Sequence, residues 1–305
     1  MDHACTSSKL QVPSPKRRVK RDVIFPTYYM RYSKPTTPGR RQMVFPDFSQ
    51  LAPSGSSERS LMRSWRRGLG RSHGKITTRH KGGGVKKMYR IIDFLQDKFD
   101  VPGTVVQIEY DPFRTARIAL VKYADGDKRY ILAAEGMKAG DPILSSQKKL
   151  AAKIGNRVPL KHVTVGTFVY NVELKRGRGG ALARSAGAYV KVLAQEGIYT
   201  HLGMRSSEVR KVHNENLATI GVASHAAHSE EVIGKAGRNR HKGIRPTVRG
   251  SAMNPVDHPH GGGEGRAPIG LKYPKTKWGK PARGVRTRNR KKYSRVFIVQ
   301  RRKSR

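Results

Sequence analysis

The sequence predicts a mainly β protein with two small β domains in tandem between two long basic arms. Two observations predict this: short strand-like runs recur through the middle of the chain, and the positive charge gathers at its two ends. Residues 1–90 carry 21 Lys and Arg against 4 Asp and Glu, residues 91–233 carry 20 against 15, and residues 234–305 carry 22 against 2. The near-neutral middle can fold alone, whereas the flanks have too little apolar surface to bury.

The first set of strand-like runs lies in the first half of the near-neutral middle. Asp125 and Gly126 separate its last two runs, and this pair favours a tight hairpin because both residues tolerate the positive φ of such turns. Short strands at close spacing predict a small barrel. The runs are residues 89–94, 104–110, 117–123 and 129–132.

A second set of runs follows, with a turn at Glu196 and Gly197. Between the two sets, residues 147–155 predict a linker with one helical turn, and helical content elsewhere is expected to be low. The runs of the second set are residues 165–172, 188–193, 208–212 and 218–222. The expected domains are an N-terminal extension and basic arm at 1–73, a first β domain at 74–150, a second at 151–233 and an extended C-terminal arm at 234–305.

The composition restricts the class of partner. A formal net charge of +42 makes the isolated chain repel itself, so a polyanion is expected as the partner. A membrane partner would need a basic amphipathic helix or an apolar span of roughly 18 residues, and the apolar runs here are only strand-sized. Cys5 is the only cysteine, which excludes an intrachain disulfide and a thiolate-rich zinc site. Nucleic acid is therefore the expected partner.

Three segments combine glycine with Lys and Arg: residues 74–84, 175–187 and 234–246. Glycine allows close backbone approach and the cations can contact phosphate. The first segment is not a nucleotide-hydrolysing phosphate loop, because Ile76 follows Lys75 where Ser or Thr is required and position 69 is Leu. Proline and glycine exclude a long helix in the third segment.

Aromatic residues such as Tyr89, Tyr273, Trp278 and Tyr293 lie among the cations of both arms and can stack on bases. Together these features predict RNA contacts by the cations of the three segments and of the C-terminal arm. The predicted RNA-binding residues are Lys75, Arg79, His80, Lys81, Lys86, Lys87, Arg90, Lys175, Arg176, Arg178, Arg184, Lys235, Arg238, Arg240, Lys242, Arg245, Arg249, Arg266, Lys277, Arg283, Arg286, Arg288, Arg301 and Arg302.

A fourth segment, residues 253–266, gathers Asp257, His258, His260 and Glu264 in an arm that is otherwise free of acid. Three interpretations stay open. Two imidazoles and two carboxylates can ligate zinc, although a proline between the histidines disfavours a preformed site. Asp257 could orient His258 for acid/base catalysis. In the third, a compact RNA-binding loop, the histidines bond RNA, and Asp257 and Glu264 cap backbone amides or bind RNA-bound Mg²⁺.

Six separated segments together resemble the bacterial-type form of the ribosomal protein L two family, over about residues 34–305. They are residues 74–90, 109–112, 129–132, 179–187, 245–250 and 253–266. The resemblance implies an OB-fold-type barrel followed by an SH3-like barrel, with both arms buried in large-subunit rRNA. It implies no cofactor of the protein's own.

The resemblance also implies a role in joining the ribosomal subunits, in tRNA binding and in the peptidyl transferase centre. His258 matches the family's histidine at that centre, with Asp257 and His260 beside it. Because the RNA carries the chemistry, these residues are expected to support it, and the protein is not expected to be an enzyme. Neighbouring ribosomal proteins, the small subunit at an intersubunit bridge and, indirectly, tRNA are the implied partners.

Three departures from the bacterial pattern bear on location. Residues 1–33 have no counterpart, Val85-Lys86-Lys87 replaces an expected His-Lys pair, and residues 267–294 are most similar to organellar members. The first and the third departure favour an organellar ribosome, mitochondrial rather than plastid, with the bacterial cytoplasm as the alternative. The basic residues within 16–21 could form a targeting segment, although Asp2 and the lack of an amphipathic period weaken that interpretation.

Overall fold

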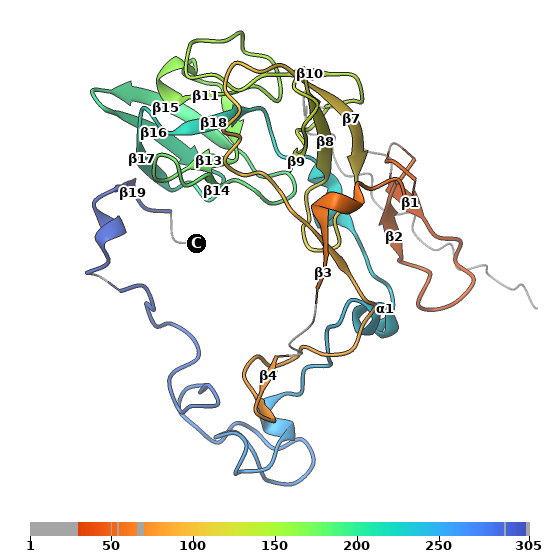
Figure 1. Cartoon of the computed structure of the whole chain (residues 1–305). Coiled ribbons are helices and arrows are strands. Elements are labelled where there is room, and N and C mark those ends of the chain that lie inside the picture. Colours follow the sequence, from red (N-terminus) through yellow and green to blue (C-terminus); the bar gives the residue numbers. More distant parts are fainter. Residues whose placement is uncertain (1–29, 50, 54, 66–69, 290, 303–305) are drawn as a thin grey trace, which may run out of the picture.

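Antiparallel strands build the sheets of the protein, which is described here by a computed structural model (Figure 1). The structure describes residues 30–302 apart from residues 50, 54, 66–69 and 290. Cys5 and the basic stretch at 16–21 therefore lie outside the described residues. The mainly β prediction is confirmed: within the described residues the one α-helix, α1, spans only Ala236–His241.

The first domain is a four-stranded sheet in the order β10-β7-β8-β9. Its central strand, β8, is buried on both faces: Ala119, Val121 and Tyr123 face one apolar cluster, while Ile118 and Leu120 face another. This alternation follows from the two-residue period of a strand. The predicted hairpin at Asp125–Gly126 joins β8 to β9. The strands are β7 (Gly103–Glu109), β8 (Ile118–Tyr123), β9 (Lys128–Leu132) and β10 (Pro142–Ile143).

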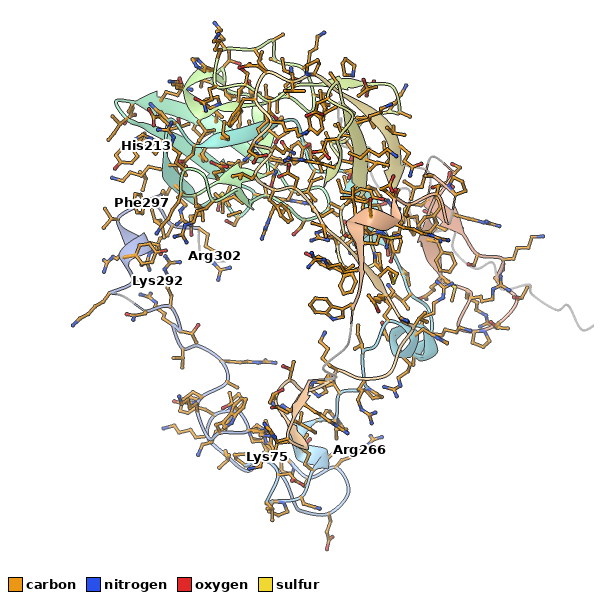
Figure 2. The ribbon with its side chains drawn as sticks, in the orientation of Figure 1. Lys75, His213, Arg266, Lys292, Phe297 and Arg302 are labelled. Atoms are coloured by element: carbon orange, nitrogen blue, oxygen red, sulfur yellow. The ribbon has the colours of Figure 1, made fainter. Side chains whose placement is uncertain are left out.

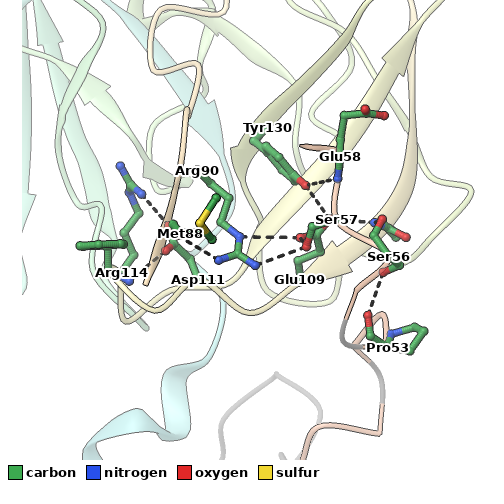
Figure 3. A network of polar contacts seen from close by, with 12 residues as sticks. Pro53, Ser56, Ser57, Glu58, Met88, Arg90, Glu109, Asp111, Arg114 and Tyr130 are labelled. Carbon is green, nitrogen blue, oxygen red and sulfur yellow. Dashed lines mark hydrogen bonds and ion pairs between the residues drawn. The ribbon is translucent and has the colours of Figure 1, made fainter. Parts of the chain in front are cut away.

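A polar network closes one end of this domain (Figure 3). Tyr130 donates its hydroxyl to Glu109 at 2.8 Å, and Ser57 donates to the other oxygen of the same carboxylate at 2.5 Å. Arg90 lies 3.9 Å from that carboxylate and also donates to the Ser57 hydroxyl at 3.3 Å. The network joins the segment before η1 (Arg59–Leu61) to strands of the sheet, and β3 (Met62–Ser64) pairs with β6 (Met88–Arg90) beside it.

The second domain is a seven-stranded sheet in the order β11-β18-β12-β15-β16-β17-β19. The predicted turn at Glu196–Gly197 joins β15 to β16, whereas β11, β16 and β19 lie outside the predicted runs. The strands are β11 (Arg157–Pro159), β12 (Phe168–Tyr170), β15 (Val190–Glu196), β16 (Tyr199–Met204), β17 (Val209–His213), β18 (Leu217–Ile220) and β19 (Ile298–Gln300). Two curved antiparallel sheets are consistent with the two predicted barrels.

Short elements complete the described chain. They are β1 (Met30–Tyr32) paired with β2 (Val44–Pro46), β4 (Arg71–Ser72) paired with β5 (Lys75–Ile76), β13 (Val172–Glu173) paired with β14 (Gly180–Leu182), and the 3-10 helices η2 (Leu160–His162), η3 (Ala226–Glu230), η4 (Gly250–Ala252) and η5 (Tyr293–Arg295).

The two domains pack against one another through buried residues. Tyr170 belongs to the apolar cluster of the first domain and donates its hydroxyl to the Leu132 carbonyl at 3.0 Å. The backbone N–H of Arg117 donates to the Ser224 hydroxyl at 3.0 Å. The predicted helical turn in the linker is wrong: residues 147–155 contain only bends and a turn, and the end of the linker is held to β18 by the hydrogen bond from Gly155 N–H to the Ile220 carbonyl.

The C-terminal arm returns to the second domain after running far from it. In Figure 1 the blue chain leaves the sheets, passes α1 and the segment beside β4, and comes back to place β19 at the sheet edge. There β19 pairs with β17, with Val209 opposite Gln300 and Arg210 opposite Ile298. None of the helices in the described ranges is long and apolar enough to cross a membrane.

Candidate nucleic-acid interface

The two basic arms meet in a lobe formed by residues 70–87 and 236–279, which we call the distal lobe. In Figure 1, β4 lies beside the pale-blue chain of the C-terminal arm, away from both sheets. Residues 80–85 pair with residues 241–245 through the backbone, so glycine-rich segments far apart in sequence form one unit. The contacts are Gly82 N–H to Gly243 O, Val85 N–H to His241 O and Arg245 N–H to His80 O, each 3.1 Å, and a bridge between Lys81 and Ile244.

Most of the predicted RNA-binding residues are exposed, and many lie in the distal lobe, where Figure 2 labels Lys75 and Arg266. His80, Lys87, Arg90, Arg238 and Arg240 are half-buried instead. The exposed ones are Lys75, Arg79, Lys81, Lys86, Lys175, Arg176, Arg178, Arg184, Lys235, Lys242, Arg245, Arg249, Arg266, Lys277, Arg283, Arg286, Arg288, Arg301 and Arg302.

Exposed aromatic rings accompany these cations. Trp278 and Tyr273 are 71% and 64% exposed. The guanidinium carbon of Arg79 lies 5.4 Å from the Trp278 ring centroid, which joins the two arms through a cation–π contact. Rings beside cations on an exposed surface can stack on bases while the cations neutralise phosphates.

The loop at 253–266 is folded tightly around His258. The backbone N–H of His260 donates to His258 Nδ1 at 3.0 Å, and the backbone N–H of Lys275 donates to His260 Nε2 at 2.8 Å. The ring centroids of His258 and His260 are 4.6 Å apart. A Cβ at Gly261 would come within 2.2 Å of the Asn254 carbonyl oxygen, so the turn requires glycine there.

These contacts indicate the tautomer and the charge of the His258 ring. Its Nδ1 accepts a hydrogen bond, so a neutral ring carries its proton on Nε2. Partial burial, and then the nearby His260 and Arg79, lower the pKa of His258 below its ordinary value. The ring is therefore neutral near pH 7 and can offer an Nε2–H donor to RNA.

The geometry of residues 253–266 distinguishes the metal site, the acid/base site and the RNA-binding loop. The His260 backbone, rather than Asp257, orients the His258 ring. The ligand atoms of Asp257, His258, His260 and Glu264 do not bring any three groups within 4.8 Å of one another. Asp257 and Glu264 are exposed. The geometry thus favours an RNA-binding loop over a preformed metal or acid/base site.

Close packing at Gly250 leads to a prediction. A Cβ there would lie 2.5 Å from two atoms of the His258 ring, and the φ of Gly250 is not one that requires glycine. Gly250→Ala is expected to displace the ring and break the His260–His258 hydrogen bond. The measurement is the ring ¹³C–¹H NMR signals of both histidines. Gly237→Ala is the control, because its Cβ would have no neighbour within 4 Å; unchanged signals in Gly250→Ala would contradict the described packing.

The basic segment of the second domain, residues 175–187, follows β13 and includes β14. Lys175 and Arg178 are exposed, and Lys175 lies 5.7 Å from the ring centroid of Tyr293 in the C-terminal arm. Arg176 pairs with Glu215 at 2.6 Å, and Arg184 lies over the Phe94 ring at 4.7 Å. Some cations of this segment therefore also hold the segment in place.

Several predicted RNA contacts have partners inside the protein. Arg90 belongs to the polar network of Figure 3. Lys87 donates to the Pro112 carbonyl at 3.3 Å. The guanidinium carbon of Arg238 lies 3.9 Å from the Phe45 ring centroid. Because Arg90, Lys87 and Arg238 contact groups of the protein itself, a mainly structural role is favoured for these three cations.

One aromatic cluster was not singled out from the sequence. The rings of Trp65, Tyr89 and Phe113 lie with centroids 5.5 to 5.7 Å apart, and Trp65 is 50% exposed. Only Tyr89 was predicted to contact RNA. No local pattern links the three, because they come from β6 and from two loops; the signal in the sequence would have been a tryptophan at position 65 among Arg63, Arg66 and Arg67.

Two β domains with clustered exposed cations and aromatic rings define a nucleic-acid-binding protein of the mainly β class. Two protein-family models match the chain: "Ribosomal Proteins L2, RNA binding N-terminal domain" over residues 58–145 and "Ribosomal Proteins L2, C-terminal domain" over residues 153–279. The chain belongs to the ribosomal protein L2 family. It is a structural, rRNA-binding protein of the large ribosomal subunit.

Proposed function

We propose that the two arms of this protein are embedded in large-subunit rRNA, where the distal lobe supports the peptidyl transferase centre. In that position the protein helps to join the two subunits and, through the RNA, to bind tRNA. RNA carries the peptidyl transfer, and His258, Asp257 and His260 support the RNA without reacting themselves.

One observation carries this proposal: cations from both arms converge in the distal lobe, away from the two folded domains. Its acids, Asp257 and Glu264, are exposed among cations. An exposed carboxylate beside an RNA backbone can bind Mg²⁺ held by that RNA, since Mg²⁺ takes oxygen ligands and keeps several waters. We place RNA-bound Mg²⁺ beside these two carboxylates, with no metal of the protein's own at this loop.

The test is binding of the full chain to large-subunit rRNA over a range of salt concentrations. A protein that contacts 6 to 10 phosphates is expected to lose roughly 10³- to 10⁵-fold in affinity between 50 and 200 mM salt. Small-subunit rRNA is the control. Affinity that hardly changes with salt, or equal affinity at every salt concentration for the small-subunit RNA, would contradict the proposal.

The role of His258 is tested in assembled large subunits that carry His258→Ala. Because the ring supports RNA, single-turnover peptidyl transfer is expected to persist at a reduced rate, and the isolated protein is expected to have no activity. Transfer by the protein alone would favour an enzyme. The readouts are the single-turnover rate and, in parallel, chemical probing of the rRNA next to the loop.

The partners and location follow from the same resemblance. We propose neighbouring ribosomal proteins and the small subunit at an intersubunit bridge as contacts. The organellar character of residues 267–294 favours a mitochondrial ribosome, and sedimentation of the tagged protein with mitochondrial, plastid or cytoplasmic large subunits separates the alternatives.

A further inference from the structure

A second group of histidines lies where the chain leaves the second domain. His225, His228 and Glu231 follow β18, and η3 covers the residues between them. A 3-10 helix has 3.0 residues per turn, so side chains three residues apart lie on the same face. His225 and Glu231 flank η3 as its N-cap and C-cap, and His228 lies within it, so the three residues are held by one short element.

The three side chains converge. Nδ1 of His228 lies 2.8 Å and Nε2 of His225 lies 3.2 Å from the same oxygen of Glu231. One ligand atom from each of the three residues lies within 4.8 Å of the others, and within the described part of the chain no other such group of His, Cys, Asp and Glu is found.

The other ring nitrogen of His225 fixes its tautomer. Nδ1 lies 2.9 Å from the Thr115 carbonyl oxygen, which can only accept a hydrogen bond, so Nδ1 carries the proton. The lone pair of a neutral ring is then on Nε2, which lies 3.2 Å from a carboxylate oxygen of Glu231. Nε2 is buried and has no hydrogen-bond partner. His225 as a whole residue is only 5% exposed.

Two acceptors that face one another at 3.2 Å repel unless a cation lies between them. Either a proton on His225 or a metal ion can supply that charge. We propose that His225 Nε2, His228 Nδ1 and the Glu231 carboxylate bind a transition-metal ion of the Zn²⁺ class.

Three features favour the metal over the proton. Histidines that bind metals usually donate their second ring N–H to a carboxylate, a backbone carbonyl or water, and His225 donates to the Thr115 carbonyl. Two imidazoles and one carboxylate are a common ligand set for Zn²⁺, which leaves a fourth position for water or another ligand. The side chain of His228 is 40% exposed, so that position is open to solvent.

The position of the site gives the metal a structural role. Thr115 belongs to the loop before β8 of the first domain, whereas the three ligands begin the segment that leads into the C-terminal arm. The bound metal would stabilise η3 and the contact of the His225 ring with Thr115 of the first domain. This contact would fix the direction in which the C-terminal arm leaves the sheets. The nearby Arg117 opposes a dication electrostatically.

The test is Zn²⁺ binding by the full chain in competition with a chromophoric chelator, together with the visible absorption of the Co²⁺-loaded protein. One Zn²⁺ per chain and the intense bands of tetrahedral Co²⁺ are expected. His228→Gln removes one ligand at a partly exposed position, so it should leave the fold intact by circular dichroism. We expect it to weaken Zn²⁺ binding on the order of 100-fold or more, because outer-shell changes alone cost 10- to 100-fold.

The matched control is His201→Gln. His201 lies 3.8 Å from Glu196, which makes a His–Glu contact without a third ligand. This variant is expected to bind Zn²⁺ as the unaltered chain does. Zn²⁺ affinity that is equal in the His228→Gln and His201→Gln variants, or absence of one-to-one binding in the unaltered chain, would overturn the metal site and favour an imidazolium–carboxylate pair. RNA binding of the unaltered chain does not depend on either outcome.

Discussion

Glu173→Gln is expected to lower the free energy of unfolding by about 3–5 kcal/mol, because it leaves a buried guanidinium without its counterion. Arg157 and Glu173 are both 0% exposed as side chains and lie 3.0 Å apart. Arg157 also donates to the Asn171 carbonyl at 2.9 Å and to the Thr219 hydroxyl at 3.2 Å. Burial lowers the pKa of Arg157, although the Glu173 carboxylate opposes that change. Gln keeps the volume but removes the charge.

The measurement is urea unfolding of the full chain followed by circular dichroism. Glu215→Gln is the matched control, since Glu215 forms an ion pair with Arg176 in which the side chains are 43% and 69% exposed. Exposed pairs contribute only about 0–1 kcal/mol. An equal effect of the two substitutions would mean that the Arg157–Glu173 pair is hydrated in solution, in disagreement with the described burial.

The second large effect concerns the distal lobe. Replacing Arg245, Arg249, Arg266 and Lys277 together by Gln is expected to weaken binding to large-subunit rRNA roughly 1,000- to 10,000-fold at 0.1 M salt. This follows because each lost phosphate contact removes a factor of nearly ten at that salt concentration. The slope of log affinity against log salt should become less steep by about 3 to 4. Filter binding or fluorescence anisotropy over a salt series measures both quantities.

The control has the same change of charge in another place. Lys138, Lys148, Lys149 and Lys153 are exposed around the linker between the domains. Their replacement by Gln also lowers the formal net charge from +42 to +38, but the linker is not among the predicted RNA contacts. It should therefore change the slope much less. If both quadruple variants lose the same affinity and slope, net charge alone would explain binding, and the distal lobe would have no special role.

Local patterns predicted those parts of the fold that depend on neighbouring residues. Gly126 adopts a φ of +85° in the turn between β8 and β9, which is the conformation that the Asp-Gly pair indicated. Strand β16 was missed although it lies in the interior of the seven-stranded sheet. Its sequence, YTHLGM, includes a glycine and a histidine and does not alternate clearly between apolar and polar residues, so its pairing with β15 and β17 decides its conformation.

The candidate interface was predicted residue by residue but not as a surface. The glycine and charge patterns identified both halves of the distal lobe, yet nothing local indicates that residues 80–85 pair with residues 241–245. The sequence alone also could not distinguish Arg90 from the exposed cations. Its partner, Glu109, lies on another strand.

The sequence by itself determined the mainly β class, the two basic arms and membership of the ribosomal protein L2 family, because these depend on composition, short-range periodicity and motifs. Only the tertiary structure decided that the C-terminal arm returns as β19, that Arg157 is buried against Glu173, and that His225 approaches Thr115 across the domain boundary. Each of these contacts joins residues whose sequence separation carries no periodic signal, and the packed path of the chain brings them together.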